Sequence, residues 1–418
     1  MDEDCIERDC PMDVRYQKTV YACFVGYIVQ AIVNNFAPLL FLTFHRSYGI
    51  PLSRITFLVT FNFALQLLVD LVSVRFVDRI GYRAALILAH LTAAFGLVML
   101  AVLPGILSDP YMGILIAVFF YAVGGGLLEV VVSPVMESCP TPNKEAAMSL
   151  LHSFYCWGHV GVVLLSTLFF ALFGISHWQI LAILWAVIPA VNMLVFTRVP
   201  IADLLPEGES AIPLGRLLKN RLFWLFVLLM ICAGACAQAV SQWASTFAEQ
   251  ALGVTKTLGD LTGPMFFAIM MGTSRLIYGK LGEKLPLKKC IIGSTLLCLA
   301  SYLIISLSPL PALGLIGCGI CGFSVGILWP GTFSMAAAAL PTGGTAMFAL
   351  LALGGDVGCS GGPTWVGLIS SAAGDNLKTG ILCAIVFPIL MLCGTIVLIH
   401  IKGRDQKLYS ASSSKENL

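Results

Sequence analysis

Apolar segments long enough to cross a lipid bilayer follow one another along almost the whole sequence, and they leave little choice of fold. A helix needs about 20 apolar residues to span the hydrocarbon core of a membrane. Because backbone groups in hydrocarbon must be paired internally, each such segment is predicted to be a transmembrane helix. The twelve segments are Thr19–Phe44, Ile55–Val74, Ala84–Leu103, Tyr111–Val135, Ala146–Phe173, Trp178–Phe196, Leu222–Ala248, Leu261–Tyr278, Cys290–Leu307, Ala312–Leu340, Ala346–Ser371 and Gly380–Ile401.

Composition excludes most soluble functions. Only 11% of the residues are charged and 58% are hydrophobic, whereas a soluble domain carries about 25% charged residues. No basic cluster suggests nucleic acid binding, and no catalytic constellation, nucleotide-binding loop or metal-ligand spacing stands out. We therefore expect no enzyme activity, cofactor or metal. The acidic start, MDEDCIERDC, does not resemble a cleavable signal peptide, so the first helix is expected to be retained.

The distribution of Lys and Arg predicts the orientation in the membrane. With the N-terminus in the cytoplasm, 19 of the 24 Lys and Arg residues fall in cytoplasmic segments and 4 in outer loops. Positive charge accumulates on the cytoplasmic side, so both termini are expected there, in a plasma or inner membrane. The predicted organisation is a tail (1–18), a six-helix bundle (19–197), a central cytoplasmic loop (198–221), a second six-helix bundle (222–401) and a tail (402–418).

The two halves of the sequence repeat each other. VRFVDRIGYR at Val74–Arg83 aligns with GKLGEKLPLK at Gly279–Lys288, 205 residues further on. Parallel repeats of helices are typical of transporters whose halves move about a central site. The repeat therefore predicts a transporter.

The first of these loops, DRIGYR at Asp78–Arg83, resembles the loop G-x-x-x-D-R-x-G-R-R of the major facilitator superfamily. Val74 replaces the leading glycine, which the second copy keeps as Gly279. The resemblance implies an all-α membrane protein with twelve helices in two pseudo-symmetric six-helix bundles. It also implies that the loop gates transport, with Asp78 contacting the start of helix 11; the alternative for the arginines is that they are ordinary cytoplasmic anchors. The predicted gating residues are Asp70, Asp78, Arg79, Arg83, Arg275, Glu283 and Lys284.

A narrower resemblance concerns helices 4 and 5. LEVVVSP at Leu128–Pro134 and LHSFYCWG at Leu151–Gly158 are similar to the fucose-galactose:proton symporter family, whose helix 4 has the pattern L-E-x-x-x-N-P. The resemblance implies that Glu129 carries a proton. Ser133 replaces the family's Asn, and Pro38 stands where fucose carriers have an acidic residue. We expect a distant relative with altered solute contacts.

Ionisable residues inside the predicted helices are candidates for ion coupling. A charged side chain at mid-bilayer costs about 3 kcal/mol or more, and such a residue usually has a function. The predicted proton-coupling residues are Glu129, Asp356, His159 and His152. The alternative is a structural hydrogen bond between helices 4 and 5. Glu137, beside the following turn, is expected to be solvated.

Amide and aromatic side chains inside the helices are candidates for solute binding. Amides pair with hydroxyl groups and indole rings pack on C–H surfaces, although a single Trp can equally face lipid or pack in the bundle. The predicted substrate-binding residues are Asn34, Asn35, Gln30, Asn62, Tyr155, Trp157, Gln238, Gln242, Trp243 and Trp329.

Together these features predict a monomeric secondary active transporter that works by alternating access. The expected mode is symport of a small polar solute, a sugar or related compound, with a proton or sodium ion. One alternative is a proton-antiporting exporter of amphipathic compounds. Another is a transporter-like solute sensor, which would usually carry a longer cytoplasmic segment than this chain does.

Overall fold

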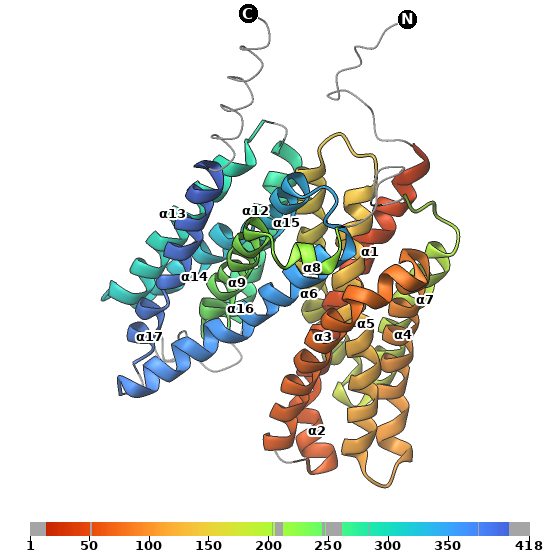
Figure 1. Cartoon of the computed structure of the whole chain (residues 1–418). Helices are drawn as coiled ribbons and strands as arrows, with labels where there is room; N and C mark the ends of the chain where they lie inside the picture. The colour runs from red at the N-terminus through yellow and green to blue at the C-terminus, as the bar shows by residue number, and fades with distance from the viewer. Residues whose placement is uncertain are drawn as a thin grey trace, which may run out of the picture. The chain divides into compact units, whose positions relative to one another are not determined.

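The computed structural model describes residues 14–50, 52–202, 204, 212–244, 247, 261–282, 284–374 and 376–400. The chain forms two compact units, whose helices are shown in Figure 1. Unit 1 comprises Met1–Ile212 and Leu340–Leu353, and unit 2 comprises Pro213–Ala339 and Gly354–Leu418. The division at residue 212 falls inside the predicted central loop, and the segment 340–353 belongs to unit 1 by its contacts.

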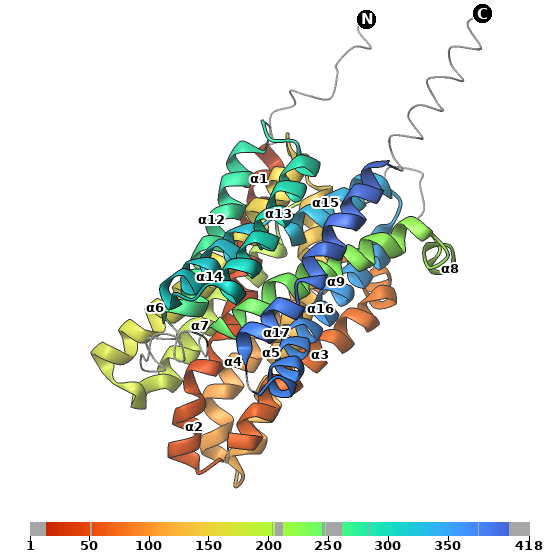
Figure 2. The same ribbon diagram turned by 90° about the vertical axis from the view of Figure 1, so that its left-hand side faces the viewer.

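Every element in the described part of the chain is helical, so the predicted all-α class is confirmed (Figure 2). Unit 1 contains α1 (Val14–Asn35), η1 (Ala37–Leu40), α2 (Phe41–Tyr48), α3 (Leu52–Ile80), α4 (Tyr82–Ile106), α5 (Pro110–Ser138), α6 (Lys144–Phe173), η2 (Ile175–His177), α7 (Trp178–Phe196) and the first residues of α16 (Gly344–Ala372). Unit 2 contains α8 (Leu214–Leu217), α9 (Arg221–Ser241), η3 (Leu261–Met265), α12 (Phe266–Leu281), α13 (Leu287–Leu307), α14 (Pro311–Val325), α15 (Leu328–Ala339), the rest of α16, α17 (Leu377–Cys383) and a helical stretch at 386–400.

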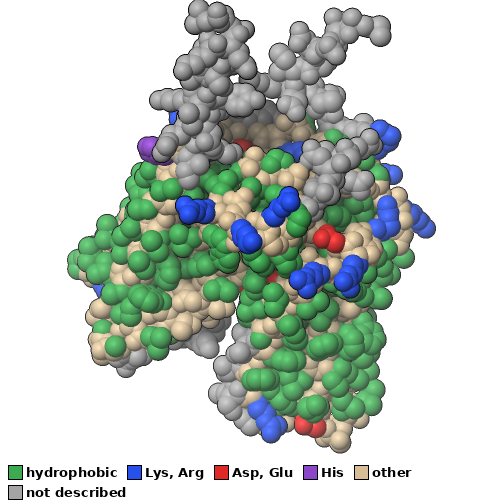
Figure 3. Space-filling model, viewed as in Figure 1, with side chains coloured by type: hydrophobic (Ala, Val, Ile, Leu, Met, Phe, Trp, Pro, Cys, Tyr) green, Lys and Arg blue, Asp and Glu red, His purple; other side chains and the backbone are tan. Residues whose placement is uncertain are grey.

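Length and hydropathy identify nine candidate membrane spans among the described residues. The other three predicted segments fall on α3, on η3 with α12, and on α16. Hydrophobic side chains cover much of the face seen in Figure 3. Leu172 and Leu368, for example, are 68% and 69% exposed. Such side chains suit contact with lipid rather than water.

Turns interrupt four of the predicted segments within the described residues, at residue 36, at 242–243, at 326–327 and at 384–385. A proline follows three of these turns within the next four residues: Pro38, Pro330 and Pro388. Proline lacks a backbone N–H and is best tolerated in the first turn of a helix. Proline alone does not divide a helix here, since Pro104, Pro134, Pro189 and Pro363 lie inside the unbroken helices α4, α5, α7 and α16.

Helices α4 and α5 pack closely through a glycine. A Cβ atom added to Gly124 on α5 would lie 2.7 Å from the backbone oxygen of Ala89 on α4. Only a residue without a side chain fits there. Small residues at a crossing are a common way for membrane helices to approach.

A buried polar pair joins three helices of unit 1. Nδ1 of His90 on α4 lies 2.7 Å from the Leu86 oxygen, and its Nε2 lies 2.8 Å from Nδ2 of Asn192 on α7. The same amide nitrogen donates to the Ala22 oxygen on α1 at 3.0 Å. Because a carbonyl faces Nδ1 and an amide donor faces Nε2, the ring is neutral with its proton on Nδ1.

Candidate functional site

Polar side chains of α1, α3, α5 and α6 meet inside unit 1, and we call this group the polar cluster. Its members are Tyr27, Gln30, Asn34, Asn35, Asn62, Gln66, Glu129, Ser133, His152 and Tyr155. Six of them are mostly shielded from the surface, since Gln30, Asn62, Gln66, Ser133, His152 and Tyr27 are each at most 7% exposed.

Glu129 is held by an amide of α1. Nε2 of Gln30 donates a hydrogen bond to Oε2 of Glu129 at 2.8 Å. Next to this pair, Nε2 of Gln66 on α3 donates to Oδ1 of Asn34 at 2.8 Å. The Tyr155 hydroxyl on α6 interacts with the side chains of Asn34 and Asn35. Four helices thus bring one carboxyl group, several amides and a phenol to one place.

A second group lies beside these residues. The Tyr27 hydroxyl on α1 is 2.8 Å from Oγ of Ser133 on α5 and 3.2 Å from Nε2 of His152 on α6. Oγ of Ser133 is 3.5 Å from the same nitrogen. The three polar atoms form a closed triangle contributed by three helices. The two hydroxyl groups can each donate and accept, and Nε2 of His152 does one or the other according to its tautomer.

The break in α1 accounts for part of this arrangement. Because α1 ends at Asn35, its last carbonyl groups lack partners within the helix. Nδ2 of Asn35 donates to the Ala31 oxygen at 2.8 Å, so the Asn35 side chain folds back onto the last turn of α1. Interrupted helices with polar last turns are typical of transporter sites. Glu129 and Ser133 are four residues apart on α5, so they share one face.

Two predicted residues of α6 lie away from these contacts. His159 is partly buried two turns beyond His152, and the hydrogen bonds of the polar cluster do not include it. Trp157 is 37% exposed on the surface of unit 1. On α3, Asn62 is buried and its Oδ1 has no hydrogen-bond partner in the described part of the chain.

The predicted residues of unit 2 gather around α9, α15 and α16. Nε1 of Trp243 donates to the Pro363 oxygen at 3.1 Å. The Trp329 ring packs against Gly355, beside Asp356, which is partly buried. Gln238 is partly buried and Gln242 is exposed just past the end of α9. In this unit, therefore, Trp243 has a structural role in addition to any contact with solute.

The gating candidates occupy varied surroundings. Asp70 is fully buried on α3, whereas Asp78, Arg79 and Lys284 are exposed. Arg83 donates from Nη1 to the Phe196 oxygen at 2.8 Å. Glu283 lies outside the described residues.

Two hydrogen bonds at or beside the gating candidates reach a break between helices or the start of a helix. Nε of Arg275 on α12 donates to the Gly326 oxygen at 2.7 Å, at the break between α14 and α15. Within unit 1, the Tyr82 hydroxyl lies 2.5 Å from Oγ1 of Thr345, at the start of α16. Tyr82 stands where the loop pattern of the first resemblance has an arginine, which is why that pattern did not single it out.

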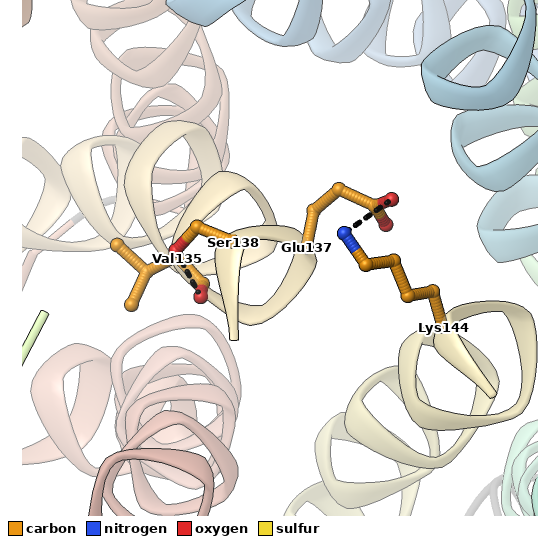
Figure 4. Close-up of polar contacts among 4 residues, drawn as sticks. All are labelled: Val135, Glu137, Ser138 and Lys144. Atoms are coloured by element: carbon orange, nitrogen blue, oxygen red, sulfur yellow. Dashed lines mark hydrogen bonds and ion pairs between the residues drawn. The ribbon is translucent and has the colours of Figure 1, made fainter. Parts of the chain in front are cut away.

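The turn between α5 and α6 buries Glu137, so the expectation that it is solvated was wrong. Its side chain is only 15% exposed, and its Oε1 lies 3.9 Å from Nζ of Lys144 (Figure 4). Its Oε2 is buried without a hydrogen-bond partner. The turn is short because the Asn143 side chain caps α6 by accepting from the Ala146 N–H at 2.8 Å. This brings the start of α6 back against the last turn of α5.

Comparison with known proteins identifies the family. The model of the Major Facilitator Superfamily matches residues 22–401. The chain belongs to the Major Facilitator Superfamily. It is therefore a multi-pass integral membrane protein and a secondary transporter rather than an enzyme, and it acts on a small molecule.

Several solved structures share the fold of this superfamily member. The E. coli fucose:proton symporter is 16% identical, with a TM-score of 0.78 over 92% of this chain and 99% of that one. A proton:xylose symporter is 11% identical, with a TM-score of 0.77 over 92% and 95%. The human organic anion transporter MFSD10 is 15% identical, with a TM-score of 0.71 over 92% and 100%. A sequence search of curated proteins found no match.

The sequence missed three residues that this transporter places in or near the polar cluster. Tyr27 lies one turn before Gln30, and Gln66 lies one turn after Asn62, so helical spacing from predicted residues could have found both. Glu137 required knowledge of how tightly the turn folds.

Proposed function

We propose that this superfamily member is a proton-coupled symporter of a small polyhydroxylated solute, a sugar or related compound, working by alternating access with both termini in the cytoplasm. Glu129 exchanges the proton. The observation that supports this most is the hydrogen bond from the Gln30 amide to the Glu129 carboxyl group inside a cluster of amides and hydroxyls. Asp356 in unit 2 stays a second candidate for the proton.

The pairing suggests how proton and solute are coupled. A charged carboxylate is the stronger acceptor and holds the Gln30 amide. Protonation weakens that bond and leaves the amide able to donate to a solute hydroxyl. It also removes a charge from a site surrounded by hydrocarbon. Binding of the proton therefore favours binding of the solute, and each raises the affinity for the other.

The chemistry of the cluster supports a hydroxylated solute. Amides of Asn34, Asn62 and Gln66 and the phenol of Tyr155 provide both donors and acceptors. Two of the structures with this fold are described as proton symporters of fucose and xylose. At these identities the likeness concerns the fold, so the solute has to be tested directly.

The test is proton movement by purified protein in liposomes that hold a pH-sensitive dye. L-fucose, D-xylose and a panel of other neutral sugars are added outside, and wild type is compared with Glu129→Gln and Asp356→Asn. We expect a sugar to drive protons inward with wild type and Asp356→Asn, and not with Glu129→Gln. Glu129→Gln should still exchange labelled sugar across the membrane, because exchange requires no release of the proton.

A Glu129→Gln protein that still moves protons together with sugar would refute the role of Glu129. Sugar transport with no proton movement in wild type would refute proton coupling. If no sugar is exchanged while amphipathic compounds are expelled against a pH gradient, the exporter alternative holds.

A further inference from the structure

The seam between α5 and α6 carries three polar layers in succession. The first contains Glu129 on α5 and Tyr155 on α6. The second is the triangle of Ser133, His152 and Tyr27. The third is the pair of Glu137 and Lys144 at the turn. The layers run from the polar cluster to the turn that joins α5 to α6.

On α5, the residues that contribute to the three layers are evenly spaced along the helix. Glu129, Ser133 and Glu137 are four residues apart in turn, so they form one stripe with about 6 Å between successive positions. On α6, Lys144 reaches Glu137 at 3.9 Å and His152 reaches Ser133 at 3.5 Å. Adjacent layers are therefore one helical turn apart on α5, and a water molecule between their side chains would complete the path.

The triangle of Tyr27, Ser133 and His152 can transfer a proton without keeping an extra one. A proton that arrives at one member of the triangle joins its oxygen or nitrogen, and the proton already in the hydrogen bond leaves towards the next member. The triangle therefore ends with the number of protons it had at the start. His152 suits this use because one nitrogen of a neutral imidazole ring donates a hydrogen bond while the other accepts one.

The end layer has an ionisable group with an unused acceptor. Oε1 of Glu137 faces Lys144, while its Oε2 is buried without a partner among the described residues. The charged groups that act on this carboxyl are Lys144 and Glu145, both on α6. Burial raises the pKa of the neighbouring Cys139 thiol to about 11, more than Lys144 lowers it, so that thiol stays neutral.

We propose that Glu137 is the residue at which the proton enters and leaves this end of the transporter, with Tyr27, Ser133 and His152 carrying it to and from Glu129. This rests on the proposed function, since it needs the proton to bind at Glu129. In the release direction, the Glu129 carboxyl group gives its proton to the triangle. The triangle gives one proton to the Glu137 carboxylate, and Glu137 gives one to water.

A purely structural ion pair is the competing explanation for Glu137. Lys144 is 51% exposed and the two charged atoms are 3.9 Å apart. A pair of this kind contributes about 0–1 kcal/mol, and it leaves the buried Oε2 unexplained. The two explanations differ in what Lys144 does, because proton transfer requires the carboxyl group but not the ammonium.

The experiment follows protonation of Glu129 after a rapid pH jump, using time-resolved infrared spectroscopy of the carboxyl C=O band. The whole protein is used in lipid, without solute. Glu129→Gln identifies the band that belongs to Glu129. Wild type is then compared with Glu137→Gln, Glu137→Asp, Lys144→Gln and Tyr27→Phe.

We expect Glu137→Gln to lower the rate at which the Glu129 band changes by roughly 100-fold. This is the lower end of what a positioned acid–base group contributes to a rate. The final amplitude of the band should stay unchanged, because the equilibrium at Glu129 does not depend on the path. Glu137→Asp should restore most of the rate, Lys144→Gln should keep it close to wild type, and Tyr27→Phe should lower it. An unchanged rate in Glu137→Gln, or equal slowing by Lys144→Gln, would overturn the proposal.

The same measurement separates this proposal from the proposed function. If Glu129 shows no titrating band, the proposed function fails at its proton site. If the band is present and its rate is independent of Glu137, the path fails while the function stands.

Discussion

His90 and Asn192 illustrate how single residues are kept in the apolar interior of this transporter. Each would lose hydrogen bonds to water on entering the membrane, and each replaces what the other has lost. Asn192 also ties the pair to the backbone of α1. A buried group that has its partner costs little, whereas one that has lost its partner carries the full desolvation penalty.

We therefore expect Asn192→Leu to destabilise the protein by about 1–2 kcal/mol, because it leaves Nε2 of His90 buried without a donor. The double variant His90→Phe with Asn192→Leu should recover part of that loss, since it removes both polar partners. Thermal unfolding in detergent, followed by tryptophan fluorescence, measures the difference. If adding His90→Phe to Asn192→Leu lowers the unfolding temperature further instead of restoring part of it, the two side chains are not coupled.

Among the helices, α5 has two faces with different roles. Gly124 lets it approach α4, while Glu129 and Ser133 carry polar chemistry towards α1 and α6. The close approach on one face fixes where the polar residues on the other face lie.

Gly124→Ala should destabilise the protein by about 1–3 kcal/mol, because its Cβ would meet the Ala89 backbone oxygen at 2.7 Å and the helices would have to separate. The matched control is Gly161→Ala on α6, where no atom lies within 4 Å of the added Cβ. That variant should be neutral or gain up to about 1 kcal/mol, because alanine favours helix over glycine. Equal unfolding temperatures for both variants would argue against tight packing of α4 on α5.

The sequence predicted the helices better than their interruptions. The length of an apolar segment reflects the thickness of the membrane, so every predicted span falls mostly on helix within the described residues. The breaks were not predictable in this way. Pro38, Pro330 and Pro388 follow three of them, whereas Pro134 and Pro189 lie inside unbroken helices.

The same contrast holds for the candidate site. Glu129, Gln30 and Asn34 were predicted because polar side chains are conspicuous in hydrocarbon. Tyr27 was missed because a tyrosine in an apolar run usually packs like any aromatic ring. Its hydrogen bonds to Ser133 and His152 depend on how three helices pack, which local sequence does not encode.

For the molecule as a whole, the distribution of Lys and Arg predicts the orientation in the membrane. Lys219 in the central segment and Lys144 in the α5–α6 turn lie on the side we assign to the cytoplasm. A C-terminal fusion to green fluorescent protein should therefore fluoresce in E. coli, and alkaline phosphatase fused there should be inactive. Alkaline phosphatase fused after Ser108, between α4 and α5, should be active. Activity with the opposite pattern would reverse the assigned orientation.

The two faces of α5 also bear on how such a protein diverges. Substitutions on the side of Glu129 and Ser133 change which solute or ion is recognised and leave the crossing at Gly124 intact. Substitutions at the crossing alter the scaffold itself, so selection removes them. New specificities can then accumulate while the architecture stays nearly constant. This fits a chain that keeps a TM-score of 0.78 to a fucose:proton symporter at 16% identity.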